Sequence, residues 1–145
     1  MSSNRLTQLV AALLILIFFA IAGCGGEQDA PPSPGTIIDF TNITPTSLTV
    51  NWTKATDDNT LQPYLEYKAV YHIYDIIGTV NAALRGRDVP LIIENSDGEE
   101  ERITWVQDNT SIDVKDLDDG IEYYFNVVVR DRYWNASVYR SVSAK

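Results

Sequence analysis

From residue 36 onward, hydrophobic and polar residues alternate along the chain with a period of two. Leu48, Val50 and Trp52 alternate with Thr49 and Asn51. The same spacing recurs in two longer runs, formed by Leu65, Tyr67, Ala69 and Tyr71 and by Tyr123, Phe125, Val127 and Val129. Alternation of this kind is typical of strands that bury one face in a core. The pattern therefore predicts an all-β domain.

Turn-forming residues separate these runs. They are found at positions 44–45, 56–59 and 118–120, which are rich in Asp, Asn, Thr, Pro and Gly. The pattern predicts strands at 37–40, 47–53, 65–72, 111–114, 123–130 and 138–142. Several short strands punctuated by turns favour a β-sandwich or a barrel.

The region 73–106 is less regular than the rest of the domain. Residues 79–87 could form a short helix, and residues 89–94 and 101–106 could pair as a hairpin. Asp97-Gly98 lies between these two segments, and Asp-Gly favours a tight hairpin turn. The sequence settles the strand positions least well here.

The N-terminus has a different pattern, an unbroken apolar run. Residues 9–22 form 14 consecutive apolar positions after Arg5. A membrane-spanning helix needs about 20 such residues. A shorter run behind a basic residue is typical of a cleavable signal peptide.

The residues that end this run carry a resemblance. Ile21-Ala22-Gly23-Cys24 resembles the lipobox of bacterial lipoproteins. The resemblance implies a diacylglycerol on the Cys24 thiol, cleavage before Cys24, and acylation of the new amine. Two or three acyl chains give lasting membrane attachment, whereas one chain binds weakly. The alternative is an ordinary secretory signal with a chance cysteine.

These patterns divide the chain into three parts. Residues 1–23 are predicted to be the signal peptide, and residues 24–35 the lipidated cysteine with a Pro- and Gly-rich spacer. Residues 36–145 form the predicted folded domain. Gly25 stands where an aspartate signals inner-membrane retention in Gram-negative lipoproteins, so the outer membrane is favoured if the envelope is Gram-negative.

Three blocks of the folded region resemble fibronectin type III domains, and one of them, from Ala55 to Thr60, resembles a bacterial subgroup of that family. The segment from Ser47 to Trp52 resembles strand B of that family, and Leu117, Gly120 and Tyr123 match its pattern entering strand F. The resemblance implies an immunoglobulin-like β-sandwich with Trp52 and Leu117 in its core. It also implies a tyrosine corner, in which the Tyr123 hydroxyl bonds to the backbone of the preceding turn.

Composition narrows the functional classes. The net charge of −9 disfavours nucleic acid as a partner. With one cysteine and one histidine, the chain has no intramolecular disulfide and no plausible zinc site. Neither a nucleophile elbow nor a phosphate-binding glycine loop is present, so we expect no enzyme activity. A weak glycan hydrolase that uses one pair of the many carboxylates is the enzymatic alternative.

Acidic residues of two loops form the first candidate site. In this fold the loops after the second and fifth predicted strands emerge at the same end, which would bring Asp57, Asp58 and Asn59 near Asp131 and Asn135. Calcium takes six to eight oxygen ligands, so this group could bind it. The alternative is that these residues cap their own turns. We expect no cofactor, with calcium as the exception to test.

Tyr133 and Trp134 form the second candidate site. Related bacterial domains tend to carry small residues or glycine at this loop position, so two aromatic residues could anchor a protein or stack on a sugar. Alternatively, Trp134 folds back over the end of the sandwich. The sequence thus predicts a non-catalytic binding module on the cell envelope with a protein or glycan ligand. A structural spacer, an assembly component and a carbohydrate-binding accessory protein are the alternatives.

Overall fold

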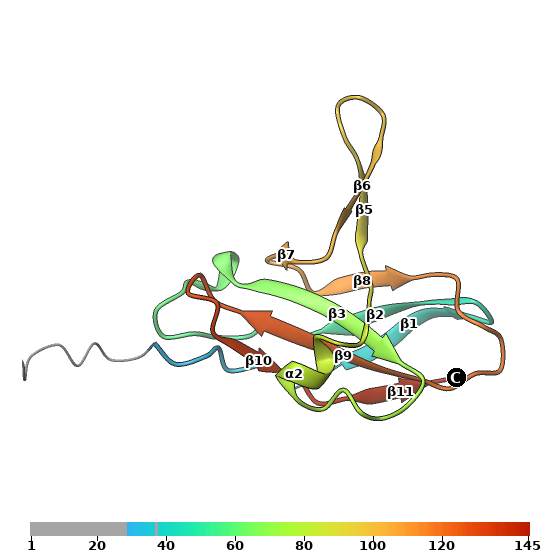
Figure 1. Cartoon of the computed structure of the whole chain (residues 1–145), viewed down its shortest axis with the longest axis horizontal. Coiled ribbons are helices and arrows are strands. Elements are labelled where there is room, and N and C mark those ends of the chain that lie inside the picture. Colours follow the sequence, from blue (N-terminus) through green and yellow to red (C-terminus); the bar gives the residue numbers. More distant parts are fainter. Residues whose placement is uncertain (1–28, 37) are drawn as a thin grey trace, which may run out of the picture.

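Two antiparallel sheets face each other across one hydrophobic core (Figure 1). The computed structural model describes residues 29–36 and 38–145. The first sheet has the order β1-β2-β8, with β1 at Ile38–Thr44, β2 at Ser47–Trp52 and β8 at Ser111–Val114. Strand β2 is central, which accounts for its buried side chains on the core face.

The second sheet is built around β3 (Glu66–His72) and β9 (Tyr123–Arg130), which pair along their full length. Four short strands flank this pair: β4 (Arg87–Asp88) and β7 (Val106–Gln107) on β3, and β10 (Ala136–Val138) and β11 (Val142–Ala144) on β9. A 3-10 turn, η1 (Gln62–Tyr64), leads into β3. The sandwich predicted from the alternation is therefore confirmed.

The core is made of the residues that the alternation assigns to inner faces. Val50, Leu65 and Val127 are fully buried, and Trp52, Tyr67 and Phe125 are nearly so. The Phe125 ring meets the Phe40 ring edge-on across the sheets, with 5.2 Å between centroids. Each such side chain contributes roughly 1.5–3 kcal/mol through burial.

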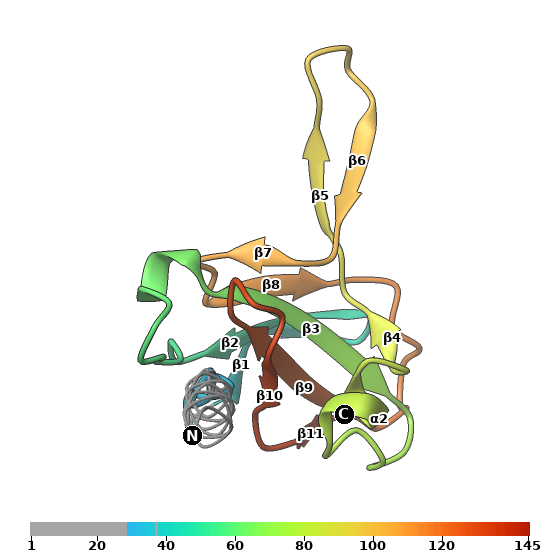
Figure 2. The same cartoon turned by 60° about the vertical axis from the view of Figure 1, so that its left-hand side comes forward.

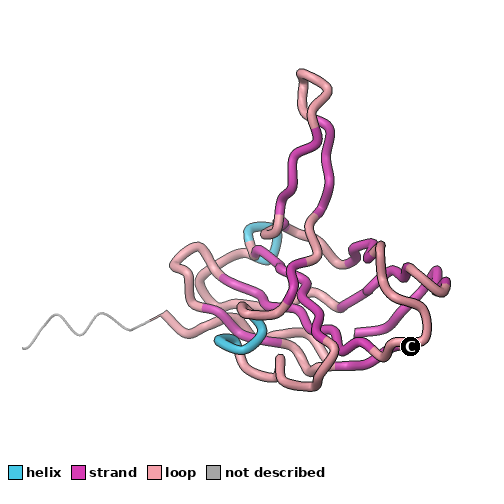
Figure 3. Tube along the Cα trace, turned by 45° about the vertical axis from the view of Figure 1, so that its right-hand side comes forward, coloured by secondary structure: helices cyan, strands magenta, loops and turns pink. Residues whose placement is uncertain are grey.

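Strand β9 is also buried on its outer face, which the sequence pattern does not show. Asn126 and Val128 point away from the main core yet are inaccessible to solvent. The segment after β3 covers them, and its short helix α2 (Val80–Ala83) packs on β9 and β10 (Figure 3). The Asn126 side-chain amide donates to the Ile77 carbonyl at 2.8 Å, so its burial leaves no lost hydrogen bond there.

The hairpin predicted in region 73–106 is present, but it pairs residues 91–94 with 100–103 in place of 89–94 with 101–106. Strands β5 (Leu91–Glu94) and β6 (Glu100–Ile103) form a two-stranded sheet that projects from the sandwich (Figure 2). Asn95 closes the turn, since its Oδ1 accepts from the amides of Asp97 and Glu99 at 3.0 and 2.9 Å. Gly98 has φ +78°, a conformation that favours glycine.

The prediction of one last strand over 138–142 is wrong, because the pairing breaks in that interval. Val138 faces Val128, whereas Val142 faces Phe125. Between these two pairs, the last strand advances by four residues while β9 advances by three. One extra residue on one side of a pair is a β-bulge, which divides this edge into β10 and β11. The first strand likewise extends further than expected, to Thr44.

Part of the predicted spacer lies against the domain. Ser33 and Thr56 pair through both backbone bonds, at 2.8 and 3.0 Å, and Pro32 is buried. At Pro32 and Ser33 the predicted spacer is therefore attached to the domain, because backbone pairing needs no large apolar side chain. Residues 1–28, including Cys24 and the predicted signal peptide, lie outside the described residues. Within the described ranges, no helix has the length and apolar character to cross a membrane.

Candidate functional site

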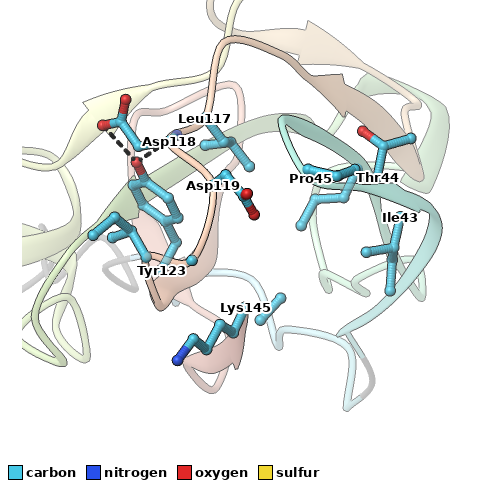
Figure 4. A pocket seen from close by; sticks show the side chains of 12 residues that line it. Ile43, Thr44, Pro45, Leu117, Asp118, Asp119, Tyr123 and Lys145 are labelled. Atoms are coloured by element: carbon cyan, nitrogen blue, oxygen red, sulfur yellow. Dashed lines mark hydrogen bonds between the residues drawn. The ribbon is translucent and has the colours of Figure 1, made fainter.

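The turn between β8 and β9 contains the predicted tyrosine corner. The Tyr123 hydroxyl accepts a hydrogen bond from the Asp118 amide at 3.1 Å and donates to Asp118 Oδ2 at 3.3 Å (Figure 4). Leu117 and Trp52 are buried, as expected. Tyr123 and Leu117 lie at one end of the sandwich, whereas Trp52 ends β2 and packs on Tyr67 at 6.1 Å between ring centroids, toward the end that holds the candidate sites.

At that opposite end, the two acidic loops meet. Asp57 and Asp131 each offer a carboxylate oxygen within 4.8 Å of the other and of an oxygen from Asp29. Asp58 is exposed and is not part of this group. The topological prediction therefore brings together two of its three aspartates, and the third member comes from the segment that the sequence assigns to the spacer.

Asp131 shapes the loop that follows β9. It is 2 % exposed, and its Oδ1 accepts from the amides of Tyr133 and Asn135 at 2.7 and 2.9 Å. Its Oδ2 accepts from the Asn135 side chain at 2.8 Å. The turn-capping role proposed as the alternative to calcium is thus present in the structure.

Asp57 caps the other loop in the same way, since its Oδ2 accepts from the amides of Asn59 and Thr60 at 3.1 and 2.7 Å. Asp29 accepts a hydrogen bond from the Asn59 side chain, while its Oδ2 is buried without a partner among the described residues. Calcium binding at this end stays a prediction.

Trp134 lies at the tip of the loop capped by Asp131. Its φ is +72°, and its residue surface is 73 % exposed; Tyr133 beside it is 53 % exposed. Left-handed backbone costs a bulky residue about 1–2 kcal/mol, whereas glycine adopts it freely. The Trp134 side chain is therefore not buried over the end of the sandwich, although its ring does lie back on Arg130.

The Trp134 ring rests on Arg130. The Arg130 guanidinium lies 4.0 Å from the centroid of Trp134 and 4.0 Å from that of Trp105, so it is sandwiched between two indoles. Its Nε donates to Glu66 Oε2 at 2.6 Å. An arginine held by a carboxylate and two aromatic faces is fixed in position, and it fixes Trp134 in turn.

Comparison with known proteins gives a fold and no family. No family model and no curated protein sequence matches the chain. Among solved structures, the third fibronectin III domain of the human KIAA0343 protein is similar, with TM-score 0.53, 17 % identity and coverage of 85 % of this chain and 87 % of that one. The sixth fibronectin type III domain of human fibronectin type III domain containing protein 3 has TM-score 0.52 and 15 % identity, covering 83 % and 90 %. This chain has the fibronectin type III fold.

Sequence reasoning missed three residues that complete the aromatic site on this fibronectin type III fold. Arg130 and Glu66 face each other across β9 and β3, and Trp105 precedes β7. The only available signal was that Arg130 ends a strand directly before the loop with two aromatic residues. Its partner Glu66 is 64 residues away in the sequence and reaches it only because β3 pairs with β9, which no local pattern specifies.

A shallow hollow of about 400 Å³ lies at the other end of the fibronectin type III fold (Figure 4). The β1–β2 turn and the turn at Asp118–Gly120 form it, with apolar walls that include Ile43, Leu48 and Ile121. Two carboxylates, Asp118 and Asp119, lie at its margin, and Asp118 is engaged by Tyr123. Leu117 and Tyr123, which the sequence predicts as structural residues, line this hollow, whereas none of the predicted binding or metal residues does.

Proposed function

We propose that the protein is a cell-envelope lipoprotein and a non-catalytic binding module that holds its partner through Tyr133 and Trp134. The observation that carries this proposal is the exposed Trp134 indole at a backbone conformation suited to glycine. Strain of this kind costs free energy and is typical of functional loops. The contact of the ring with Arg130 offsets part of this cost, and most of the side chain surface stays open to a partner.

Rigid support of the ring strengthens this proposal. Arg130 occupies one face of the Trp134 indole, and Glu66 and Trp105 hold Arg130. A binding residue that is already ordered loses little conformational entropy when the partner arrives. Tryptophan, tyrosine and arginine are also the residues most enriched among those that dominate binding energy.

The exposed rings of Tyr133 and Trp134 limit the kind of partner that this surface can bind. Arg132 donates to the Tyr133 hydroxyl at 2.6 Å, so guanidinium and phenol form one polar margin beside the indole. A protein surface or a sugar ring can pack on such a surface, and both ligand classes remain in the proposal. The alternative role as a structural spacer gives no reason for the strained tryptophan.

Site-specific crosslinking tests the binding surface. Benzoylphenylalanine in place of Trp134 should trap a discrete envelope partner, whereas the same residue in place of Tyr74 should not. Tyr74 is a matched control, since it is 63 % exposed and follows β3 at the opposite end of the sandwich. Trp134→Ala should lose the partner without loss of folding. Identical crosslinks from both positions would contradict the proposal.

A glycan partner needs a separate measurement. Purified domain should bind members of a glycan array, and Tyr133→Ala and Trp134→Ala should remove that binding while Tyr74→Ala does not. Turnover of any glycan, lost on substitution of a carboxylate pair, would show an enzyme instead of a binding module.

The membrane anchor rests on Cys24 and the residues before it. Metabolic labelling with an alkyne-bearing fatty acid should mark the wild-type protein, and Cys24→Ser should abolish the label and release the protein from the membrane fraction. In a Gram-negative envelope, we expect the labelled protein in the outer membrane. An unlabelled wild-type protein would overturn the lipoprotein assignment and leave the binding surface untouched.

A further inference from the structure

Residues 91–103, which contain β5 and β6, project from the sandwich as a separate arm (Figure 2). We call this segment the hairpin arm. Among the described residues, β5 and β6 pair only with each other. No side chain of the arm is buried, and Leu91, Asn95 and Ile103 alone are half-buried. The arm therefore draws almost no stability from the core.

A lone two-stranded hairpin is only marginally stable in water. This one also exposes Ile92, which is 45 % accessible, and Ile93 beside it. The outer edge of each strand carries backbone N–H and C=O groups without strand partners, and such edges are ready templates for another strand. The hairpin arm thus offers a free strand edge and exposed isoleucines to which a further strand can add.

Charge decides which partner fits. The arm carries five carboxylates, at Glu94, Asp97, Glu99, Glu100 and Glu101, against the single guanidinium of Arg102, a net charge of −4. None of these carboxylates is among the ion pairs of the described residues. Two arms from separate copies would repel each other, which disfavours a homodimer at this edge.

One cross-strand pair within the arm consists of two carboxylates. Glu94 lies directly opposite Glu100 in the β5–β6 register. Like charges directly opposite each other destabilise an antiparallel pair. A lysine or arginine side chain placed between these two carboxylates would be attracted to both of them. Binding a cationic segment would therefore relieve the repulsion that destabilises the free arm.

We propose that the hairpin arm binds an extended basic segment of another protein, which adds as a third strand along one edge. Backbone hydrogen bonds to the free edge supply pairing, as in other cases of strand addition. Lysine or arginine side chains at alternate positions of the segment contact the arm's carboxylates, and the intervening apolar side chains contact Ile92 or Ile93. This surface is separate from Tyr133 and Trp134.

A defined probe tests the proposal. The probe is a fluorescent peptide of about nine residues that alternates lysine with isoleucine or threonine, a length near that of an ordinary strand. We expect saturable binding to the intact protein that weakens as salt is raised, with amide chemical-shift changes concentrated in residues 91–103. A probe N-methylated at alternate positions loses one hydrogen-bonding edge and should bind about tenfold or more weakly.

Matched charge reversals locate the site. Replacing Glu99, Glu100 and Glu101 by lysine should weaken probe binding about tenfold or more. Replacing Asp39, Asp75 and Asp119 by lysine changes the net charge equally, on exposed positions away from the arm, and should have little effect. Circular dichroism and thermal melting of both variants establish that the sandwich is intact.

Three outcomes would overturn this inference: equal weakening by both triple variants, undiminished binding of the N-methylated probe, or no binding by the wild-type protein. The first two would mean attraction to overall charge. Trp134→Ala should bind the probe as the wild type does, so failure here and failure of the proposed aromatic surface are distinguishable.

Discussion

The Tyr139 hydroxyl donates a hydrogen bond to the Thr53 backbone carbonyl at 2.6 Å. Tyr139 lies in the bulge between β10 and β11, and Thr53 directly follows β2 in the other sheet. The bond therefore ties the two sheets together at the point where the last strand changes register. The Tyr139 side chain is buried, and this burial raises its pKa well above the usual tyrosine range.

Ionisation of Tyr139 should destabilise the domain at high pH. The pKa of Tyr139 in the folded protein lies above the unfolded value of about 10. The stability that its neutral hydroxyl contributes is therefore complete below pH 10 and is lost as the pH rises toward the folded pKa. Tyr139→Phe should cost about 1 kcal/mol at pH 7. It should also remove up to about 1.4 kcal/mol per pH unit from the alkaline slope. Urea unfolding at a series of pH values measures both, and an unchanged slope would contradict the assignment.

A side chain at position 35 should release the segment that precedes β1. A Cβ there would collide with the side-chain and backbone oxygens of Thr53 and would lie 2.8 Å from the Tyr139 ring. We expect Gly35→Ala to destabilise the domain by about 1–3 kcal/mol. It should also speed hydrogen exchange at the Thr56 amide, which bonds to Ser33. Gly78→Ala is the control, since no atom lies within 4 Å of its added Cβ.

Loss of the tyrosine corner should be measurable as a loss of stability. Tyr123→Phe removes the acceptor of the Asp118 amide. A backbone N–H that is left without a hydrogen-bond partner inside the protein costs about 1–3 kcal/mol. Tyr124→Phe is a neighbouring control, because that hydroxyl reaches only the Glu122 carboxylate at the surface, at 3.4 Å. Chemical denaturation should separate the two variants, and equal losses would argue against a special role for Tyr123.

Calcium should stabilise the domain if the clustered carboxylates bind it. At a hundredfold excess over its dissociation constant, a ligand adds about 2.7 kcal/mol to the free energy of unfolding. Asp29→Asn should reduce that gain, since Asp29 belongs to the cluster, while Asp58→Asn should not, since Asp58 lies outside it. Denaturation with and without calcium measures the difference. An unaffected wild type would leave turn capping as the sole role of Asp57 and Asp131.

The faces of the strands were predictable because burial follows a local rule. Alternation selected Val50, Tyr67 and Phe125 for the core, and all three are buried there. Turn chemistry was predictable for the same reason, since Asp97-Gly98 marks the hairpin and Tyr123 reaches a backbone amide only five residues away. The second buried face of β9 was not predictable, because its cover comes from residues far away in the sequence.

The sequence by itself determined the strand alternation, the tyrosine corner and the pair of loops that carry Asp57, Asp131 and Trp134, because each depends on residues close together in the chain. Only the tertiary structure placed Arg130 between Trp105 and Trp134 and brought Asp29 to the acidic loops. Those contacts depend on strand register and on the path of the first residues across the domain. Strands β3 and β9 are far apart in the sequence, so their pairing follows from the packing of the whole domain and not from a local pattern.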